Sequence, residues 1–449
     1  MSVVTLEPCA IGDRRIVLGT ASESGTTRVR SGACAAGILA FGVWVLAAAA
    51  AHASPGTLTS AAELAVIRAA ADAGRSPAKE DRDRLLADAR KTWAWGSVSG
   101  TYGTIDNAGS KQCSPMNGVG VSYLLEGAPD AYAQVIGAHL SGDMSLASQA
   151  RAHVLDLIDT TGFTGLSGDY NANNQCILDL SLAIPVWIET ARLLEDTTIW
   201  KSADTAAFRG WLASQVYPKT AWASRVRRNN WGAAGSLASD AIASYVAGGI
   251  ASLEEYSPTR LTLAPAQAVA QHVAMQLSRV ASTWVGDAQC AKHGIQWHGG
   301  IPEELRRGST GCDGTYLLAS DAARTYQMMH TELLVFHAEA MRRRGDLSLY
   351  QAKTSQGAPA ILQAILFVVR NPSPGGVSWP WEPARWGTLI TAASFYPDAT
   401  LASLVNSSSA TFRGGRTLPY TRITARPVAT TSPTPSAELG APGPPYLMP

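Results

Sequence analysis

Apolar residues recur at intervals of three and four along most of the chain, which is the spacing of helices with one buried face. Alternation of apolar and polar residues, the pattern of a half-buried strand, is scarce, and 420–425 is a weak candidate. The expected helices lie at 60–74, 79–94, 130–158, 177–195, 204–216, 232–248, 263–284, 314–344 and 358–370. About nine helices without a heptad repeat predict an all-α fold of paired helices, stacked in layers or closed into a ring.

The composition indicates a globular protein with a large core, because 46% of the 449 residues are hydrophobic and 16% are charged. The first 53 residues hold four of the 36 basic and three of the 35 acidic residues, so 32 of each sign remain. A neutral body has no field that attracts nucleic acid or an anionic membrane. An acidic polymer would need local Arg clusters, such as those at 225–228 and 306–307. The Arg run at 342–344 ends a predicted helix and is expected to be a solvated face.

The N-terminal segment has the features of an export signal. Arg28 and Arg30 precede an apolar run at 33–51, and Ala51-His52-Ala53 is typical of a cleavage site. We expect a signal peptide at 1–53, a single helical domain at 54–426 and a flexible Pro/Thr/Ser-rich tail at 427–449. The mature protein would be a periplasmic or secreted monomer, not bound to a membrane, and an uncleaved anchor is the alternative.

Cysteine usage predicts disulfides. Two of the six Cys lie in the expected signal, and the others are Cys113, Cys176, Cys290 and Cys312. An even number in an exported protein favours pairing. We expect a Cys290–Cys312 bond, which would close a local loop, and then Cys113–Cys176. No Cys or His spacing is typical of zinc, so no metal site is expected.

Two carboxamides and an indole open the predicted helix at 232–248, in the run Arg228-Asn229-Asn230-Trp231-Gly232. Carboxamides hold a carboxylate without titrating, and an indole offers a sugar ring an apolar face. The free amides of a helix N-terminus favour a nearby negative charge. The run therefore suits an acidic sugar, although an Asn N-cap followed by a core Trp is the structural alternative.

Two polar loops are further candidates. Asn174 and Gln175 end an amide-rich loop before the helix at 177–195, and they either line a sugar subsite or serve as turn and capping residues. The loop 292–307 contains Trp297 and His298, and His298 is a candidate proton acceptor near neutral pH. Its two adjacent Glu residues, Glu303 and Glu304, follow Pro302, and we interpret them as N-terminal charges of a helix.

A third constellation lies within the predicted helix 314–344. Tyr326 and His330 are four residues apart and share a face, which His337 continues. Arg324 precedes His330 by six residues, roughly 120° around the helix. Buried polar side chains among apolar neighbours are costly unless they are paired. This favours a functional site over a purely structural hydrogen-bond network.

Four segments in this order resemble the alginate lyase superfamily of polysaccharide lyases, over roughly 90–400. The first segment is Asn-Asn-Gln at 173–175 followed by Ile-Pro-Val-Trp-Ile-Glu-Thr-Ala-Arg-Leu-Leu at 184–194. The others are Asn-Asn-Trp-Gly at 229–232, Gly-Ile-Pro-Glu-Glu-Leu-Arg-Arg at 300–307, and Arg-x5-His at 324–330. The resemblance implies an (α/α) toroid with an open cleft that cleaves uronic-acid polymers by β-elimination. That chemistry needs no metal or organic cofactor.

The resemblance also implies roles for individual residues. Asn229 or Asn230 would neutralise the substrate carboxylate, Arg324 would assist, and His330 would stand in the Arg-x5-His helix. The family's alginate branch has a His where this chain has Trp231, and a Tyr where it has Thr331. The base and acid must then come from elsewhere. Candidates are His272 and His298 for the base, and Tyr326, Tyr316 and Tyr245 for the acid, while Trp231, Trp297, Asn174, Gln175, Arg228 and Tyr316 would bind sugar.

The expected function is therefore cleavage of an alginate- or glucuronan-type polysaccharide by β-elimination. One alternative is a glycoside hydrolase on a similar scaffold, which would use carboxylates such as Glu304 and Asp313. The other is an exported protein that binds glycans without cleaving them.

Overall fold

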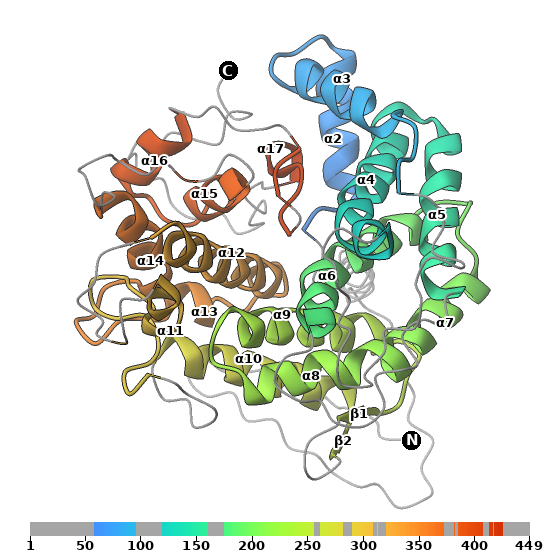
Figure 1. Ribbon diagram of the computed structural model, residues 1–449. Coiled ribbons are helices and arrows are strands. Elements are labelled where there is room, and N and C mark those ends of the chain that lie inside the picture. The colour runs from blue at the N-terminus through green and yellow to red at the C-terminus, as the bar shows by residue number, and fades with distance from the viewer. Residues whose placement is uncertain are drawn as a thin grey trace, which may run out of the picture. The chain divides into compact units, whose positions relative to one another are not determined.

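Helices make up nearly all of the regular structure in the computed structural model, as the all-α prediction expected (Figure 1). The chain divides into residues 1–53 and residues 54–449, and every described residue belongs to the second unit. The described residues are 58–95, 119–159, 175–255, 261–281, 290–308, 312, 320–371, 381, 385–406, 413–415 and 417–424, without the side chains of 119–122, 175, 176 and 308. The predicted signal and tail lie outside them.

The helices in chain order are α2 (Ala61–Asp72), α3 (Ala78–Ala89), α4 (Val119–Ser141), α5 (Met144–Asp159), α6 (Gln175–Glu195), α7 (Ser202–Trp211), α8 (Tyr217–Val226), α9 (Asn230–Val246), α10 (Pro265–Val280), α11 (Pro302–Leu305), α12 (Asp321–Arg343), α13 (Ser348–Gln351), α14 (Ala360–Arg370), α15 (Trp386–Ala393), α16 (Ala399–Asn406) and α17 (Thr421–Thr424). A π-helical turn, Leu212–Val216, joins α7 to α8, and a 3₁₀ turn, Arg306–Gly308, follows α11. Strands β1 (Leu253–Glu255) and β2 (Leu261–Leu263) form an antiparallel hairpin.

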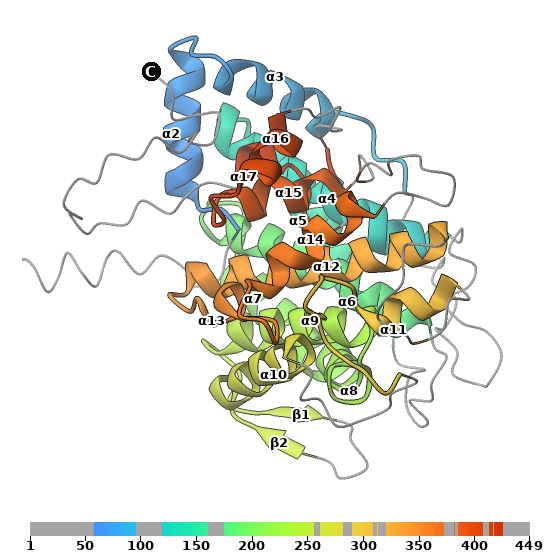
Figure 2. The same cartoon turned by 90° about the vertical axis from the view of Figure 1, so that its left-hand side faces the viewer.

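An inner row of long helices carries the core. Helix α4 packs against α6, α6 against α9, and α9 against α12. Outer helices cover this row, with α5 on α4 and α6, α8 on α6 and α9, α10 on α9, and α14 on α12. In the turned view α9 lies between α12 and the layer of α8 and α10, with the hairpin beyond α8 (Figure 2). Helices α4, α6 and α9 are rich in apolar residues because they have neighbours on several sides, whereas α12 also buries polar side chains such as Gln327, His330 and Glu339.

Ion pairs join the two ends of the described chain and close the toroid. Arg343 on α12 reaches Glu63 on α2 at 3.0 Å and donates to the backbone oxygen of Thr424 at 3.2 Å. Arg422 on α17 pairs with Asp81 on α3 at 3.4 Å. The first and last helices therefore meet through charged side chains.

Several local predictions differ from the structure. The Arg run at 342–344 is not a solvated face: the side chain of Arg343 is only 7% exposed, and its two neighbours pair with Glu339 and Asp240. The single helix expected at 130–158 is two helices, because Gly142 has a φ of 80° that breaks the run. The strand candidate at 420–425 contains the short helix α17, and the hairpin β1–β2 was not expected.

None of the helices in the described residues combines the length and apolar character that crossing a membrane requires.

Candidate active site

The N-terminus of α9 lies where the sequence predicts a helix to begin. Asn229 is the N-cap, and its Oδ1 accepts the backbone N–H of Trp231 at 3.1 Å. Asn230 is 0% exposed, and its Nδ2 donates to Sδ of Met329 at 2.9 Å. Within the described residues its Oδ1 has no hydrogen-bond partner. A thioether is a weak acceptor, so this amide is only loosely engaged by the protein.

Glu304 on α11 joins α9 to α12. Its Oε1 accepts the backbone N–H of Asn230 and also contacts Nδ1 of His330 at 2.9 Å. Oε2 has no hydrogen-bond partner among the described residues, and the side chain is 0% exposed. The sequence predicts Glu304 to be a helix N-terminal charge. It does stand in the first turn of α11, but its contacts are to distant segments.

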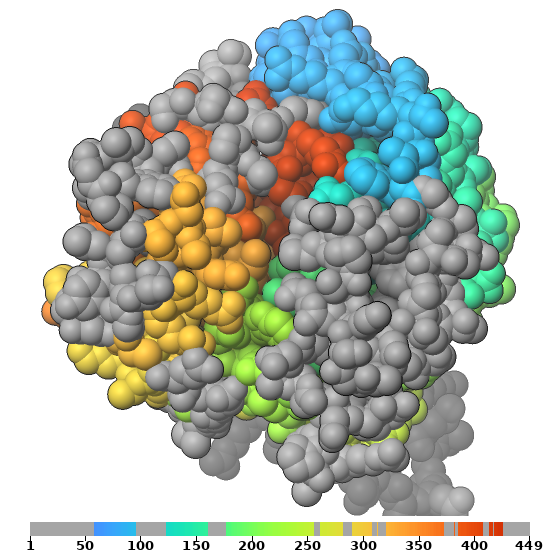
Figure 3. All heavy atoms as spheres, in the orientation of Figure 1, coloured from blue at the N-terminus to red at the C-terminus, as the bar shows by residue number. Residues whose placement is uncertain are grey.

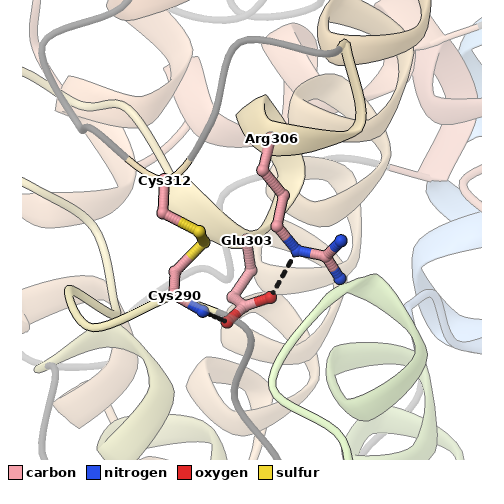
Figure 4. Close-up of a disulfide and its surroundings, with 4 residues drawn as sticks. All are labelled: Cys290, Glu303, Arg306 and Cys312. Atoms are coloured by element: carbon pink, nitrogen blue, oxygen red, sulfur yellow. Dashed lines mark hydrogen bonds and ion pairs between the residues drawn. A yellow bond between two sulfur atoms is a disulfide. The ribbon is translucent and has the colours of Figure 1, made fainter.

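A disulfide fixes the loop that leads into α11 (Figure 4). The predicted bond between Cys290 and Cys312 is confirmed. Glu303 lies beside it, accepting the backbone N–H of Cys290 at 2.8 Å and Nε of Arg306 at 3.0 Å. The loop is therefore held by a covalent bond and a buried carboxylate. The other expected pair, Cys113–Cys176, lies outside the described residues.

A small pocket of about 10 Å³, roughly the room that one water molecule needs, lies beside this loop. It is lined by Arg228, Arg279, Val280, His293, Gly294, Ile295, Ile301, Glu303, His330 and Leu334. These residues come from the segment just before α9, from α10, from the disulfide-bonded loop, from α11 and from α12. Figure 3 shows the yellow and orange segments meeting the green one on the face turned to the viewer. Two guanidinium groups and two imidazoles line the pocket against one carboxyl group, so basic side chains predominate in its lining.

His293 is the pocket residue most suited to remain neutral. Burial lowers the pKa of its ring, nearby Arg228 lowers it further, and Glu303 opposes both. A neutral imidazole near pH 7 accepts a proton or a hydrogen bond. Burial also lowers the pKa of Arg279 to about 9, but its guanidinium is engaged by backbone and side-chain acceptors, including Ser236 Oγ at 2.7 Å.

His298 and Trp297 lie on the same loop but are not among the residues lining the pocket. Nδ1 of His298 accepts the backbone N–H of Gly300 at 3.1 Å, and the ring packs 5.3 Å from that of Phe367. Trp297 is 55% exposed, as a residue that stacks on a sugar ring would be.

Arg324 and Tyr326 stand on the first turns of α12. Tyr326 and His330 are four residues apart in this helix and share a face, as predicted. The guanidinium of Arg307 covers the ring of Tyr326 at 4.6 Å. Arg324 donates to Asp321 at 3.1 Å. Neither Arg324 nor Tyr326 lines the pocket.

His272, a candidate for the base, is enclosed by the protein and does not line the pocket. It is 0% exposed, its Nε2 lies 3.0 Å from the Tyr217 hydroxyl, and its Nδ1 lies 2.9 Å from that of Ser224. Burial lowers the pKa of the ring, and its ion-pair partner Glu255 opposes this. With both ring nitrogens bonded inside the protein, His272 belongs to a structural network between α8, α10 and β1.

The remaining candidates are scattered. Trp231 is half-buried, with the guanidinium of Arg227 5.6 Å from its ring. Tyr245 is buried and donates to Glu195 at 2.8 Å, away from the pocket. Asn174, Tyr316 and the side chain of Gln175 lie outside the described residues, as does Asp313.

The structure adds His293, which lines the pocket, and it gives Glu304 contacts to Asn230 and His330 that the sequence analysis did not predict. His293 lies in a loop already singled out, but only the fold brings it beside Arg228. Within the described part of the chain, no three His, Cys, Asp or Glu side chains are grouped to hold a metal ion.

Comparison with known proteins supports the fold. No protein-family model and no curated protein matches the chain. Among solved structures, it is similar to an alginate lyase from Bacteroides ovatus. The TM-score is 0.55 and the sequence identity is 16%, over 82% of this chain and 99% of that one. The likeness shows that the two chains share a helical toroid, as the sequence resemblance implied.

Proposed function

We propose that this protein is a polysaccharide lyase that cleaves a uronic-acid-containing polysaccharide, of the alginate or glucuronan type, by β-elimination. The observation that carries the proposal is the pocket in which Arg228, His293 and His330 converge beside the N-terminus of α9. The fold shared with an alginate lyase supports it at a coarser level.

The chemistry explains why such groups are needed. Removing the C5 proton of a uronate adds negative charge beside a carboxylate that is already charged. Fixed guanidinium and amide donors stabilise the enolate-like intermediate, and one such donor contributes about 3–4 kcal/mol. A base positioned at the proton adds a factor of roughly 10²–10⁴ in rate.

In this proposal Arg228 and Asn230 hold the carboxylate, and His330 takes the C5 proton. Arg228 replaces Arg324 in this role because it lines the pocket and Arg324 does not. Asn230 is fully covered, so its loosely held amide must turn toward the pocket to take part. Tyr326 does not line the pocket itself, and it is proposed as the acid because it stands one turn before His330 on the same face of α12. The exposed Trp297 is proposed as a sugar platform. The Cys290–Cys312 bond supports a place of action outside the cytoplasm.

An ultraviolet assay tests the proposal, because elimination leaves a carbon–carbon double bond that absorbs and hydrolysis does not. Purified protein is offered glucuronan, polymannuronate, polyguluronate and hyaluronan. We expect absorbance to rise with at least one of them. New reducing ends without absorbance would indicate hydrolysis instead, and binding without either signal would indicate a non-catalytic protein.

Two variants then locate the base. His330→Gln is expected to lower turnover by roughly 10²-fold or more, because it removes the proton acceptor. His298→Gln serves as the matched comparison, since His298 lies on the neighbouring loop but does not line the pocket. If His298→Gln abolished turnover and His330→Gln did not, the base would be His298 and our pocket assignment would be wrong.

A further inference from the structure

Glu304 is a fully buried carboxyl group that contacts two residues of the proposed site. Glutamate side chains are almost never fully buried unless they are paired. Here one oxygen, Oε1, meets both the backbone N–H of Asn230 and Nδ1 of His330, residues 74 and 26 positions away along the chain. The short helix α11 thereby connects the N-terminus of α9 to the middle of α12.

The shared oxygen determines where the proton on His330 must be. Because Oε1 accepts the N–H of Asn230, it presents lone pairs to the donors around it. Nδ1 of His330, 2.9 Å away, makes a favourable contact with this acceptor when it carries the hydrogen. A neutral imidazole has one N–H, so Nε2 is left with the lone pair. His330 lines the pocket, whereas Glu304 lies behind it.

We propose that Glu304 is a positioning residue that holds His330 in the tautomer whose Nε2 is basic. The same contact sets the distance between that ring and Asn230. A carboxyl group behind an imidazole fixes its orientation and stabilises the imidazolium that forms when the ring takes a proton. The source of the proton that the His330 ring takes up, C5 of a uronate, rests on the proposed function. The tautomer of the free protein does not depend on that function.

The neighbouring Glu303 provides a contrast within the same short helix. It is also buried, at 4% exposure, but its oxygens accept Cys290 N and Arg306 Nε. Glu303 therefore holds the disulfide-bonded loop, while Glu304 holds the imidazole. Two adjacent carboxyl groups with different partners allow one to be changed as a control for the other.

The tautomer can be measured without any substrate. Protein labelled with ¹⁵N-histidine is examined by NMR at a pH where the His330 ring is neutral, and its signals are assigned by their loss in His330→Gln. We expect a protonated Nδ1 and an unprotonated Nε2. Glu304→Ala removes the acceptor and is expected to shift His330 toward the Nε2–H form. Glu304→Gln, which keeps an acceptor oxygen, and the control Glu303→Gln should both retain Nδ1–H.

An Nε2–H tautomer in the unaltered protein would overturn the proposal, even if Glu304→Ala failed to fold. So would an unchanged tautomer in folded Glu304→Ala. If a substrate is found, Glu304→Ala should lower kcat on the order of 10²-fold, with a much smaller change in KM. If the expected tautomer is found but no uronate polymer is cleaved, the proposed function fails and the positioning role stands.

Discussion

Glu189 on α6 should make the stability of this protein depend on pH. It is 4% exposed, and its Oε2 accepts the backbone N–H of Leu58 at 2.6 Å. Burial raises the pKa of this carboxyl group from 4.5 to about 7, although Arg192, 3.9 Å away, and the Leu58 amide both oppose the rise. The folded protein therefore keeps a proton on Glu189 at a pH where the unfolded chain has lost it.

The sign and size follow from linkage. Below pH 4.5 both states are protonated, and the full contribution to stability is present. As the pH rises toward 7 the unfolded chain releases its proton first, so the unfolded state is favoured and the contribution is lost. At about 1.36 kcal/mol for each pH unit between the two pKa values, the total is about 3.4 kcal/mol, of which about 2.5 falls between pH 5 and pH 8.

The perturbation is Glu189→Gln, whose amide resembles the protonated carboxyl group at every pH. Urea unfolding of both proteins at pH 5 and pH 8 gives the difference in their free energies of unfolding. We expect this difference to shift by about 2.5 kcal/mol in favour of the variant as the pH rises. Arg192 attracts the ionised form of Glu189, and this effect is already contained in the pKa of about 7. Every other titrating group is common to both proteins. A difference that stays constant with pH would show that Glu189 is ionised in the folded state.

Three further predictions concern stability. Replacing Cys290 and Cys312 by Ser should lower the free energy of unfolding in urea by about 3 kcal/mol, because the bond closes a loop with a sequence separation of 22. Gly232→Ala should unfold the protein or greatly lower its Tm, because the new Cβ would lie 1.8 Å from the backbone oxygen of Arg227. Its control is Gly210→Ala, whose new Cβ meets nothing within 4 Å and which should raise the free energy of unfolding by about 0.5–1 kcal/mol. Burial lowers the pKa of His153 from 6.5 to about 4, so below pH 6.5 the unfolded chain binds a proton that the folded protein does not, and acid favours unfolding. In urea unfolding, His153→Gln should therefore lose less stability between pH 7 and pH 4.5 than the unaltered protein does.

Helical periodicity predicted the framework well because a helix with one buried face records its environment locally. The segments expected at 60–74, 177–195 and 358–370 correspond closely to α2, α6 and α14. Periodicity did not predict helices that are buried on all sides, nor helix ends that depend on a single residue such as Gly142. Helix α8 was missed because Lys219 and Ser224 are buried within it, so its sequence lacks a polar face.

The site was predicted less completely, since its contacts join residues far apart in the sequence. The helix start at Asn230 and the shared face of Tyr326 and His330 could be predicted because both are local properties. The partner of His330 could not, because Glu304 lies 26 residues away on a four-residue helix that has no periodic signal. The same limit applies to His272, whose burial depends on Tyr217 and Ser224 from another helix.

The two departures from the alginate lyase resemblance constrain any mechanism. Thr331, at the position where a Tyr was expected, is 0% exposed and donates its hydroxyl to the backbone oxygen of Gln327 at 2.8 Å. It therefore has no free proton for a leaving group. Trp231, at the position where a His was expected, offers an apolar ring and an N–H donor but no base. Under the proposed function, a base in this pocket would come from α12 or from the disulfide-bonded loop, which carry His330 and His293.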